Sequence, residues 1–237
     1  MQITLKILRR ESPDTSPYWQ SIPFQTEDEN ATVATALTNI NSGNGLTDTE
    51  GNAVRLPIQW ECSCLQKKCG ACAMVVNGCP VLACNAQLKQ FGKSGTITVE
   101  PLRKFPVVSD LVTDRSIIFE NLKTLRLWFA QQAQTDGDIA YESSRCLQCG
   151  CCLEVCPNFY AGGEFFGMAG FVPISRILTA LPESQKQELC QAYRKRLYEG
   201  CGKSLACRNV CPAGIDIDKL LINSNAVAVW KRFFRKR

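Results

Sequence analysis

The chain has 237 residues, a formal net charge of +5, fifteen cysteines and no histidine. Its length suits one large domain or two of ordinary size, each able to bury its own core. The absence of histidine excludes Rieske centres, histidine-ligated haem, Cys2His2 zinc sites and histidine acid–base catalysis within this chain.

The two ends of the chain and its cysteine count further limit the class of protein to which it can belong. Residues 1–7 alternate like a strand and lack the charged and apolar regions of a signal peptide. No apolar stretch approaches the ~20 residues that span a bilayer. Much of the positive charge lies within residues 231–237, so no nucleic-acid partner is expected. An odd cysteine count with C-x2-C spacings favours thiolate metal ligands in a reducing compartment over a secreted disulfide framework.

The N-terminal residues predict a small α+β unit. Residues 2–8 and 19–24 have the alternation of β-strands, and residues 96–100 form a plausible closing strand. Over residues 32–42 the apolar side chains recur at i, i+3, i+4 and i+7, which is typical of an amphipathic helix packed on a sheet.

Four cysteines after this helix have the spacing of a plant-type [2Fe-2S] site, C-x4-C-x2-C followed by a distant cysteine: Cys64, Cys69, Cys72 and Cys84. Asn77-Gly78 is a strong two-residue hairpin signal, and a hairpin there brings Cys84 beside Cys72. A structural zinc site is the alternative, although zinc favours paired, short-spaced cysteines.

Prolines at positions 101 and 106 suggest a domain boundary, which divides the chain into residues 1–105 and 106–237. Beyond the boundary the apolar periodicity becomes helical. We expect helices over residues 111–134, 173–182, 183–199 and, capped by Asp216, 217–222. Cys62, Cys79 and Cys190 fit no ligand spacing, so each is expected to be an inert, buried or half-buried side chain.

Two related cysteine motifs occupy the C-terminal half. The first matches C-x2-C-x2-C-x3-C-P at Cys146, Cys149, Cys152 and Cys156. The second ends in Pro212 and contains Cys201, Cys207 and Cys211, with Ser204 where the pattern requires a cysteine. In bacterial ferredoxins with two such motifs, the last cysteine of each motif ligates the cluster of the other.

This crossed ligation divides the cysteines into two sets. A [4Fe-4S] cluster is expected on four thiolates: Cys146, Cys149, Cys152 and Cys211. A [3Fe-4S] cluster is expected on three: Cys156, Cys201 and Cys207. Cys151 is adjacent to Cys152 and stays an alternative to it, and a structural zinc site is again the alternative to a cluster.

A plant-type site, then a complete cubane motif, then a motif lacking one cysteine resembles the iron-sulfur subunit of succinate dehydrogenase and quinol:fumarate reductase. The matching segments are Ser63-Cys64, Cys69-Gly-Ala-Cys72-Ala-Met, Leu82-Ala-Cys84 and Cys156-Pro157. The resemblance implies an α+β chain: an N-terminal β-grasp, plant-type [2Fe-2S] ferredoxin-like domain followed by an all-α helical ferredoxin domain.

The resemblance also implies function and partners. An iron-sulfur subunit of this family relays electrons through its clusters between the FAD of a flavoprotein partner, which oxidises succinate or reduces fumarate, and a quinone at the membrane anchor subunits. Such a subunit lies peripherally on the cytoplasmic face of a bacterial-type membrane. Consistent with this, the chain shows no glycine-rich dinucleotide fingerprint and no candidate catalytic residue.

Two departures from the family pattern concern the quinone. Members that use ubiquinone commonly carry tryptophans after the Cys-Pro pair and a histidine after the first cysteine of the last group. This chain has Asn-Phe-Tyr-Ala at residues 158–161 and a glycine at position 202. We therefore expect a different quinone, or a contact that depends more on the anchor. The alternative functions are the same module in a thiol:fumarate reductase or heterodisulfide-reductase-like complex, and a non-redox zinc-binding interaction protein.

Overall fold

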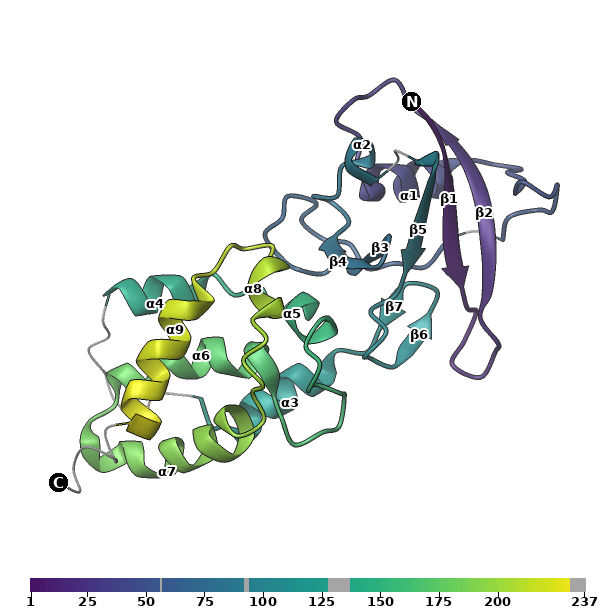
Figure 1. Ribbon diagram of the computed structural model, residues 1–237. Helices are drawn as coiled ribbons and strands as arrows, with labels where there is room; N and C mark the ends of the chain where they lie inside the picture. The colour runs from purple at the N-terminus through teal and green to yellow at the C-terminus, as the bar shows by residue number, and fades with distance from the viewer. Residues whose placement is uncertain (56, 92–93, 128–136, 231–237) are drawn as a thin grey trace. The chain divides into compact units, whose positions relative to one another are not determined.

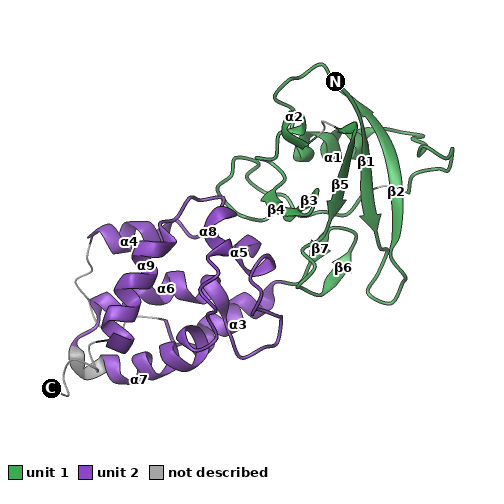
Figure 2. Cartoon of the chain, viewed as in Figure 1, with its two compact units in different colours: residues 1–114 green, residues 115–237 purple. Residues whose placement is uncertain are grey.

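The computed structural model describes residues 1–55, 57–91, 94–127 and 137–230. The chain divides into two compact units, Met1–Asp114 and Arg115–Arg237 (Figure 2). Residues 106–114, which the proline pattern assigns to the second domain, are grouped with the first unit. The predicted helical segment around Phe129 and the basic residues 231–237 lie outside the described residues.

A mixed five-stranded sheet forms the core of the first unit, in the order β2-β1-β5-β3-β4 (Figure 1). Its strands are β1 (Gln2–Arg9), β2 (Tyr18–Gln25), β3 (Ala73–Val76), β4 (Cys79–Leu82) and β5 (Thr96–Glu100). β1 pairs antiparallel with β2 and parallel with β5. The alternation in β1 buries Ile3, Leu5 and Ile7, so the strands predicted over residues 2–8, 19–24 and 96–100 are confirmed.

Helix α1 (Val33–Ser42) lies beside this sheet and confirms the predicted amphipathic helix (Figure 1). Thr32 caps it, and its hydroxyl accepts a hydrogen bond from the Thr35 N–H at 3.2 Å. N–H groups in the first turn of a helix have no partner within the helix. Two of them donate to carbonyls on either side of Cys84: Val33 N to Ala86 O at 2.9 Å and Ala34 N to Ala83 O at 3.1 Å. The helix therefore holds the backbone around Cys84. A short helix, α2 (Leu88–Phe91), follows.

The helix predicted from residue 111 is wrong at its start, because residues 107–113 form a small hairpin, β6 (Val107–Ser109) and β7 (Val112–Thr113). Helix α3 begins only at Ser116 and ends at Thr124. Asp110 lies in the turn with φ 42 and is almost fully buried. Its carboxylate accepts hydrogen bonds from the Arg10 N–H and the Gln59 N–H, each at 2.9 Å.

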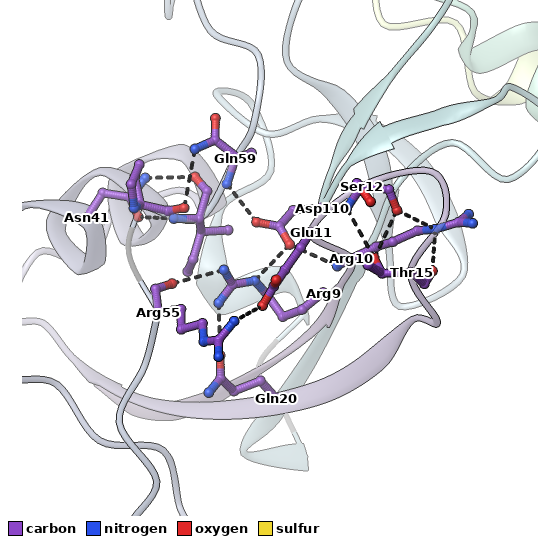
Figure 3. Close-up of polar contacts among 12 residues, drawn as sticks. Arg9, Arg10, Glu11, Ser12, Thr15, Gln20, Asn41, Arg55, Gln59 and Asp110 are labelled. Carbon is purple, nitrogen blue, oxygen red and sulfur yellow. Dashed lines mark hydrogen bonds and ion pairs between the residues drawn. The ribbon is translucent and has the colours of Figure 1, made fainter.

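The same carboxylate forms a buried ion pair with Arg9, with Nε 3.0 Å from Oδ1 and both side chains 3% exposed (Figure 3). Arg9 also donates to Gln20 Oε1 at 2.8 Å and to the Arg55 carbonyl at 2.9 Å. The hairpin is therefore joined to the sheet by charge-assisted hydrogen bonds between residues far apart in sequence, and local apolar periodicity contains no sign of this contact.

The described part of the second unit is helical. Its elements are α3, α4 (Gly137–Ser144), α5 (Cys151–Glu154), α6 (Gly167–Ala180), α7 (Glu183–Tyr193), the π-helical segment η2 (Arg194–Tyr198), α8 (Ala206–Asn209), α9 (Ile217–Asn225) and the π-helical segment η3 (Ala226–Trp230). α6 is the central helix, because it packs against α4 and α9 (Figure 1). The Asp216 cap is confirmed, since its Oδ1 accepts from the Lys219 N–H at 3.1 Å.

Helix α6 corrects a second prediction. The helix was expected to begin at Pro173, but it begins at Gly167 and contains Pro173 in its interior. Proline has no N–H to donate to the carbonyl of residue 169, four positions earlier. That carbonyl instead accepts a hydrogen bond from the side-chain amide of Gln148 at 3.3 Å. The helix tolerates its proline because another segment supplies a donor. α9 also extends beyond the predicted end at residue 222.

Candidate functional site: three cysteine groups

The loop between Cys64 and Cys72 directs backbone N–H groups at cysteine sulfurs. The Gln66 and Lys68 N–H groups each donate to Cys64 Sγ at 3.3 Å, and the Lys67 N–H donates to Cys84 Sγ at the same distance. Leu65, Lys67 and Gly70 have φ values of 53, 60 and 77. These left-handed backbone conformations turn successive N–H groups inward, which suits a bound anion such as a thiolate-ligated cluster.

The hairpin turn brings the distant cysteine to this loop, as predicted. Asn77 and Gly78 have φ values of 46 and 78, which a two-residue primed turn requires. Asn77 Oδ1 accepts from the Thr98 N–H at 2.7 Å, and this bond fixes the turn to β5. After the hairpin, the Ala83 N–H donates to the Cys72 carbonyl at 2.9 Å. Cys72 and Cys84 are in hydrogen-bonding contact, and Cys69 lies near enough to repel Cys72 electrostatically.

The thiols of this group differ in acidity. Hydrogen bonds from the N–H groups of Gln66 and Lys68 lower the pKa of Cys64 to about 7. Burial raises the pKa of Cys72 to about 12, and its neighbours Cys84 and Cys69 add repulsion. Iron binds thiolates, so a cluster ligated by Cys72 would require that thiol to lose its proton.

A second group of cysteines surrounds a small hollow in the helical unit, and it contains cysteines from both C-terminal motifs: Cys146, Cys149, Cys152 and Cys211. The remaining wall is largely apolar, with Met168, Val172, Ile215 and Ile217 among its residues. Burial raises the pKa of Cys146 to about 11, and the neighbouring Cys149 and Cys211 thiols add to the shift. Burial also raises the pKa of Cys152.

Cys151 and Cys152 have different positions, although they are adjacent in sequence. Cys152 lines the hollow of the second group and also the neighbouring hollow, as does Met168. Cys151 is fully buried and donates a hydrogen bond to the sulfur of Cys149, which lowers the pKa of Cys149 and raises that of Cys151. Arg115 adds positive charge near Cys149 and donates to its carbonyl at 3.0 Å. Cys151 is therefore placed as a hydrogen-bond donor to Cys149, a predicted ligand.

The third group lines a small neighbouring hollow: Cys156, Cys201 and Cys207. Ser204, the residue in place of a fourth cysteine, lines the same hollow and is exposed. Burial, with repulsion from Cys156 and Cys201, raises the pKa of Cys207 to about 11. The cysteines of each predicted set thus line one hollow together, with Cys152 lining both hollows, and their assignment as cluster ligands stays a prediction.

The two departures from the quinone pattern lie side by side, which the sequence did not show. Asn158 Nδ2 donates to the Gly200 carbonyl at 2.6 Å. A Cβ placed on Gly202 would lie 3.1 Å from the same nitrogen. A side chain at position 202 would thus require Asn158 to move. The position of Asn158 therefore depends on a glycine at position 202, and both residues line the hollow of Cys156, Cys201 and Cys207.

The cysteines outside the ligand spacings require one correction. Cys62 and Cys79 are exposed, not buried or half-buried, since Cys62 lies in a loop and Cys79 begins β4 directly after the turn. Cys190 is partly buried against the helical core. Within residues 1–55, 57–91, 94–127 and 137–230, no three Cys, Asp or Glu side chains are spaced to hold a single metal ion. The same ranges contain no helix long and apolar enough to cross a membrane.

Known proteins show the same arrangement of domains. The 2Fe-2S iron-sulfur cluster binding domain family matches residues 4–120, and the 4Fe-4S dicluster domain family matches residues 142–215. The succinate dehydrogenase iron-sulfur subunit of Bacillus subtilis (strain 168) is 34% identical over 230 residues, covering 89% of this chain and 86% of that protein. The chain belongs to the family of succinate dehydrogenase and fumarate reductase iron-sulfur subunits.

A second relative and a solved structure are also similar to this chain. The fumarate reductase iron-sulfur subunit of Wolinella succinogenes is 29% identical over 169 residues, covering 63% of this chain and 68% of that protein. A chain of the Mycobacterium smegmatis Sdh1 complex in the apo form shares the fold, with a TM-score of 0.72 over 98% of this chain and 97% of that chain at 24% identity.

Family membership confirms several predictions. The chain is an electron-relaying iron-sulfur subunit of an oxidoreductase complex of the succinate dehydrogenase and fumarate reductase type. It carries a [2Fe-2S] and a [4Fe-4S] cluster, and a third cluster in this family is consistent with the [3Fe-4S] prediction. Its mixed sheet followed by helices is an α+β architecture. The three groups suit such clusters, because each converges thiols, and at the first group also N–H donors, on one place.

Proposed function

We propose that the three cysteine groups hold the three clusters of an electron relay between a flavoprotein subunit and a membrane quinone. The [2Fe-2S] cluster is assigned to Cys64, Cys69, Cys72 and Cys84. The [4Fe-4S] cluster is assigned to Cys146, Cys149, Cys152 and Cys211, and the [3Fe-4S] cluster to Cys156, Cys201 and Cys207. The observation that carries the proposal is the exchange of cysteines between the two C-terminal motifs to line the two hollows.

The clusters, when bound, supply one-electron carriage, and the chain supplies their order and environment. The first group lies in a largely exposed loop, while the second is enclosed by apolar side chains. Exposure, net charge and hydrogen bonds to sulfur set cluster potentials over a wide range. Differences in environment therefore give the relay different potentials along its length. No side chain of the chain is assigned a bond-making role.

The partners follow from family membership as part of the proposal. A flavoprotein with FAD oxidises succinate or reduces fumarate, and membrane anchor subunits bind the quinone. These partners hold the chain on the cytoplasmic face of the membrane. The first unit is proposed to be a β-grasp domain, supported by the mixed sheet with β1 parallel to β5 and by α1 beside it. Asn158 and Gly202 suggest a quinone contact unlike that of ubiquinone-using members.

Electron paramagnetic resonance during a redox titration of the purified complex tests the assignment. We expect a [2Fe-2S] signal in the reduced complex and a [3Fe-4S] signal after air oxidation. Ser204→Cys adds a thiol to the hollow of Cys156, Cys201 and Cys207, where crossed ligation leaves the cluster only three cysteine ligands, so we expect a fourth iron and loss of the three-iron signal. Ser144→Cys, on α4, is the matched control. Zinc without iron and sulfide in the purified protein, or an unchanged three-iron signal in Ser204→Cys, contradicts the assignment.

A further inference from the structure

Gln148 lies inside the first C-terminal motif but matches no ligand position. Its side-chain nitrogen Nε2 is 3.2 Å from Cys146 Sγ and 3.3 Å from the Ala169 carbonyl oxygen. The residue also lines the hollow that the four cysteines surround. One amide group thus contacts a cysteine sulfur and the central helix α6 together.

The orientation of this amide follows from its partners. Sulfur and the carbonyl oxygen are both acceptors, so only the NH2 end of the amide can face them. The other end, Oε1, is buried and has no hydrogen-bond partner among the residues that the structure describes. Exchanging the two ends would place an oxygen against two acceptors and is therefore unfavourable. The geometry fixes a donor against Cys146.

The backbone at this position carries a conformational cost. Gln148 has φ 51, a left-handed conformation that favours glycine. A glutamine here is tolerated when its side chain makes compensating contacts, and the two hydrogen bonds of Nε2 are such contacts.

The bond to Ala169 has a separate structural reason. In a regular α-helix the N–H of residue 173 would bond the carbonyl of residue 169, but Pro173 has none. Gln148 donates to that carbonyl instead. The bond to helix α6 is therefore explained by the proline, whereas the bond to Cys146 Sγ has no such explanation.

We propose that Gln148 is a positioning residue that raises the reduction potential of the four-cysteine cluster by donating a hydrogen bond to the Cys146 sulfur. The inference rests on the proposed assignment of Cys146 as a ligand. Adding an electron makes a cluster and its thiolates more negative, and a donor at sulfur stabilises the more negative state. The amide therefore makes reduction of this cluster more favourable.

Two variants of the full chain in its complex test the inference. Gln148→Leu removes the donor, and Gln148→Glu keeps the length but places a carboxylate by the sulfur. We expect Gln148→Leu to lower the ratio of reduced to oxidised cluster about tenfold at a fixed solution potential, equal to about 59 mV for one electron. Gln148→Glu should lower it further. The [2Fe-2S] and [3Fe-4S] midpoints should stay unchanged in the same titration.

The order of the variants separates tuning from packing. If Gln148 only fills space, the glutamate variant should resemble wild type more than the leucine variant does. Gln191→Leu is the matched control, because it removes an exposed amide from α7 in the same unit. Its cluster potentials should equal those of wild type.

Pro173→Ala separates the two hydrogen bonds of Nε2. The new N–H of residue 173 can bond the Ala169 carbonyl, so Gln148→Leu should lower the melting temperature less in this background than in wild type. The shift in cluster potential should persist there. A shift that disappears in the Pro173→Ala background, or a four-iron midpoint insensitive to both Gln148 variants, overturns the inference. Absence of the four-iron signal in wild type overturns the proposed function instead.

Discussion

The two units place their cysteines differently with respect to their cores. In the first unit many of the fully buried side chains come from the sheet and α1, including Leu5, Ile22, Leu37 and Val99. Cys64 and Cys69 lie in an outer loop. In the second unit five of the proposed ligand cysteines pack directly against the hydrophobic core: Cys146, Cys152, Cys201, Cys207 and Cys211. The first unit can build its core without a cluster, whereas the second is built around its hollows.

Because of this difference, we expect the stability of the second unit to depend on bound iron more strongly than that of the first. Burial raises the pKa values of Cys146, Cys152 and Cys207 in the second unit, and repulsion from neighbouring cysteines adds to these shifts. Iron compensates for that repulsion, so cluster binding and folding are coupled there. The first unit retains hydrogen bonds and apolar contacts that do not involve cysteine.

The largest expected effect is therefore the loss of iron from the whole chain. After removal of the clusters with a chelator and an oxidant, under conditions that keep the thiols reduced afterwards, α6 and α9 should lose most of their amide protection. β1 and β5 should keep theirs. Hydrogen exchange measured by mass spectrometry on holo and apo protein gives both results in one experiment. Equal loss of protection in the two units would show that the comparison is wrong.

The next effect concerns the first unit. Arg9→Leu leaves Asp110 buried without its ion-pair partner, and loss of one partner of such a pair costs about 3–5 kcal/mol. Thermal unfolding of the first unit measures the cost. Arg55→Leu is the matched control, because Arg55 pairs with Glu11 at side chains 75% and 49% exposed, where a pair is worth about 0–1 kcal/mol (Figure 3). Equal destabilisation by both variants would contradict the role given to Arg9.

A smaller effect is expected in the second unit. The hydroxyl of the fully buried Tyr193 donates to Asn225 Oδ1 at 2.7 Å, between α7 and α9. Tyr193→Phe leaves that oxygen without its donor, at a cost of about 1–3 kcal/mol. Chemical denaturation of the holoprotein measures the change. The control is Tyr141→Phe, whose hydroxyl lies on a side chain 66% exposed and whose loss should change stability little.

The smallest effect tests how tightly the turn holds the first cysteine group. Gly78 has φ 78, and an alanine there pays the left-handed penalty of roughly 1 kcal/mol. Nothing lies within 4 Å of its added Cβ, so the penalty is conformational only. Gly137→Ala is the control, since its Cβ is equally free and its φ is not positive. Chemical denaturation measures the free energy of unfolding of both variants. If Gly78→Ala lowers it no more than Gly137→Ala does, the turn assignment is contradicted.

The successes and failures of the sequence analysis follow from the range of the interactions. Cysteine grouping was predictable because ligand spacing is local and crossed ligation follows one rule, and Asn77-Gly78 encodes its own turn. The β6–β7 hairpin was missed because it depends on Asp110 meeting Arg9, 101 positions away in sequence. The start of α6 was missed because the donor that compensates for Pro173 is a side chain in another segment.

Cys152 and Met168 line both hollows of the second unit. In the proposed assignment Cys152 and Met168 lie between the two clusters, and the rate of electron tunnelling falls steeply as the distance through such a barrier increases. The rate of transfer between those two clusters should therefore depend on how these side chains pack. Replacing Met168 by a smaller or larger apolar residue changes the packing of that barrier and leaves every sulfur ligand in place. The rate of electron transfer between the two clusters proposed for the second unit can thus change without any change in their ligands.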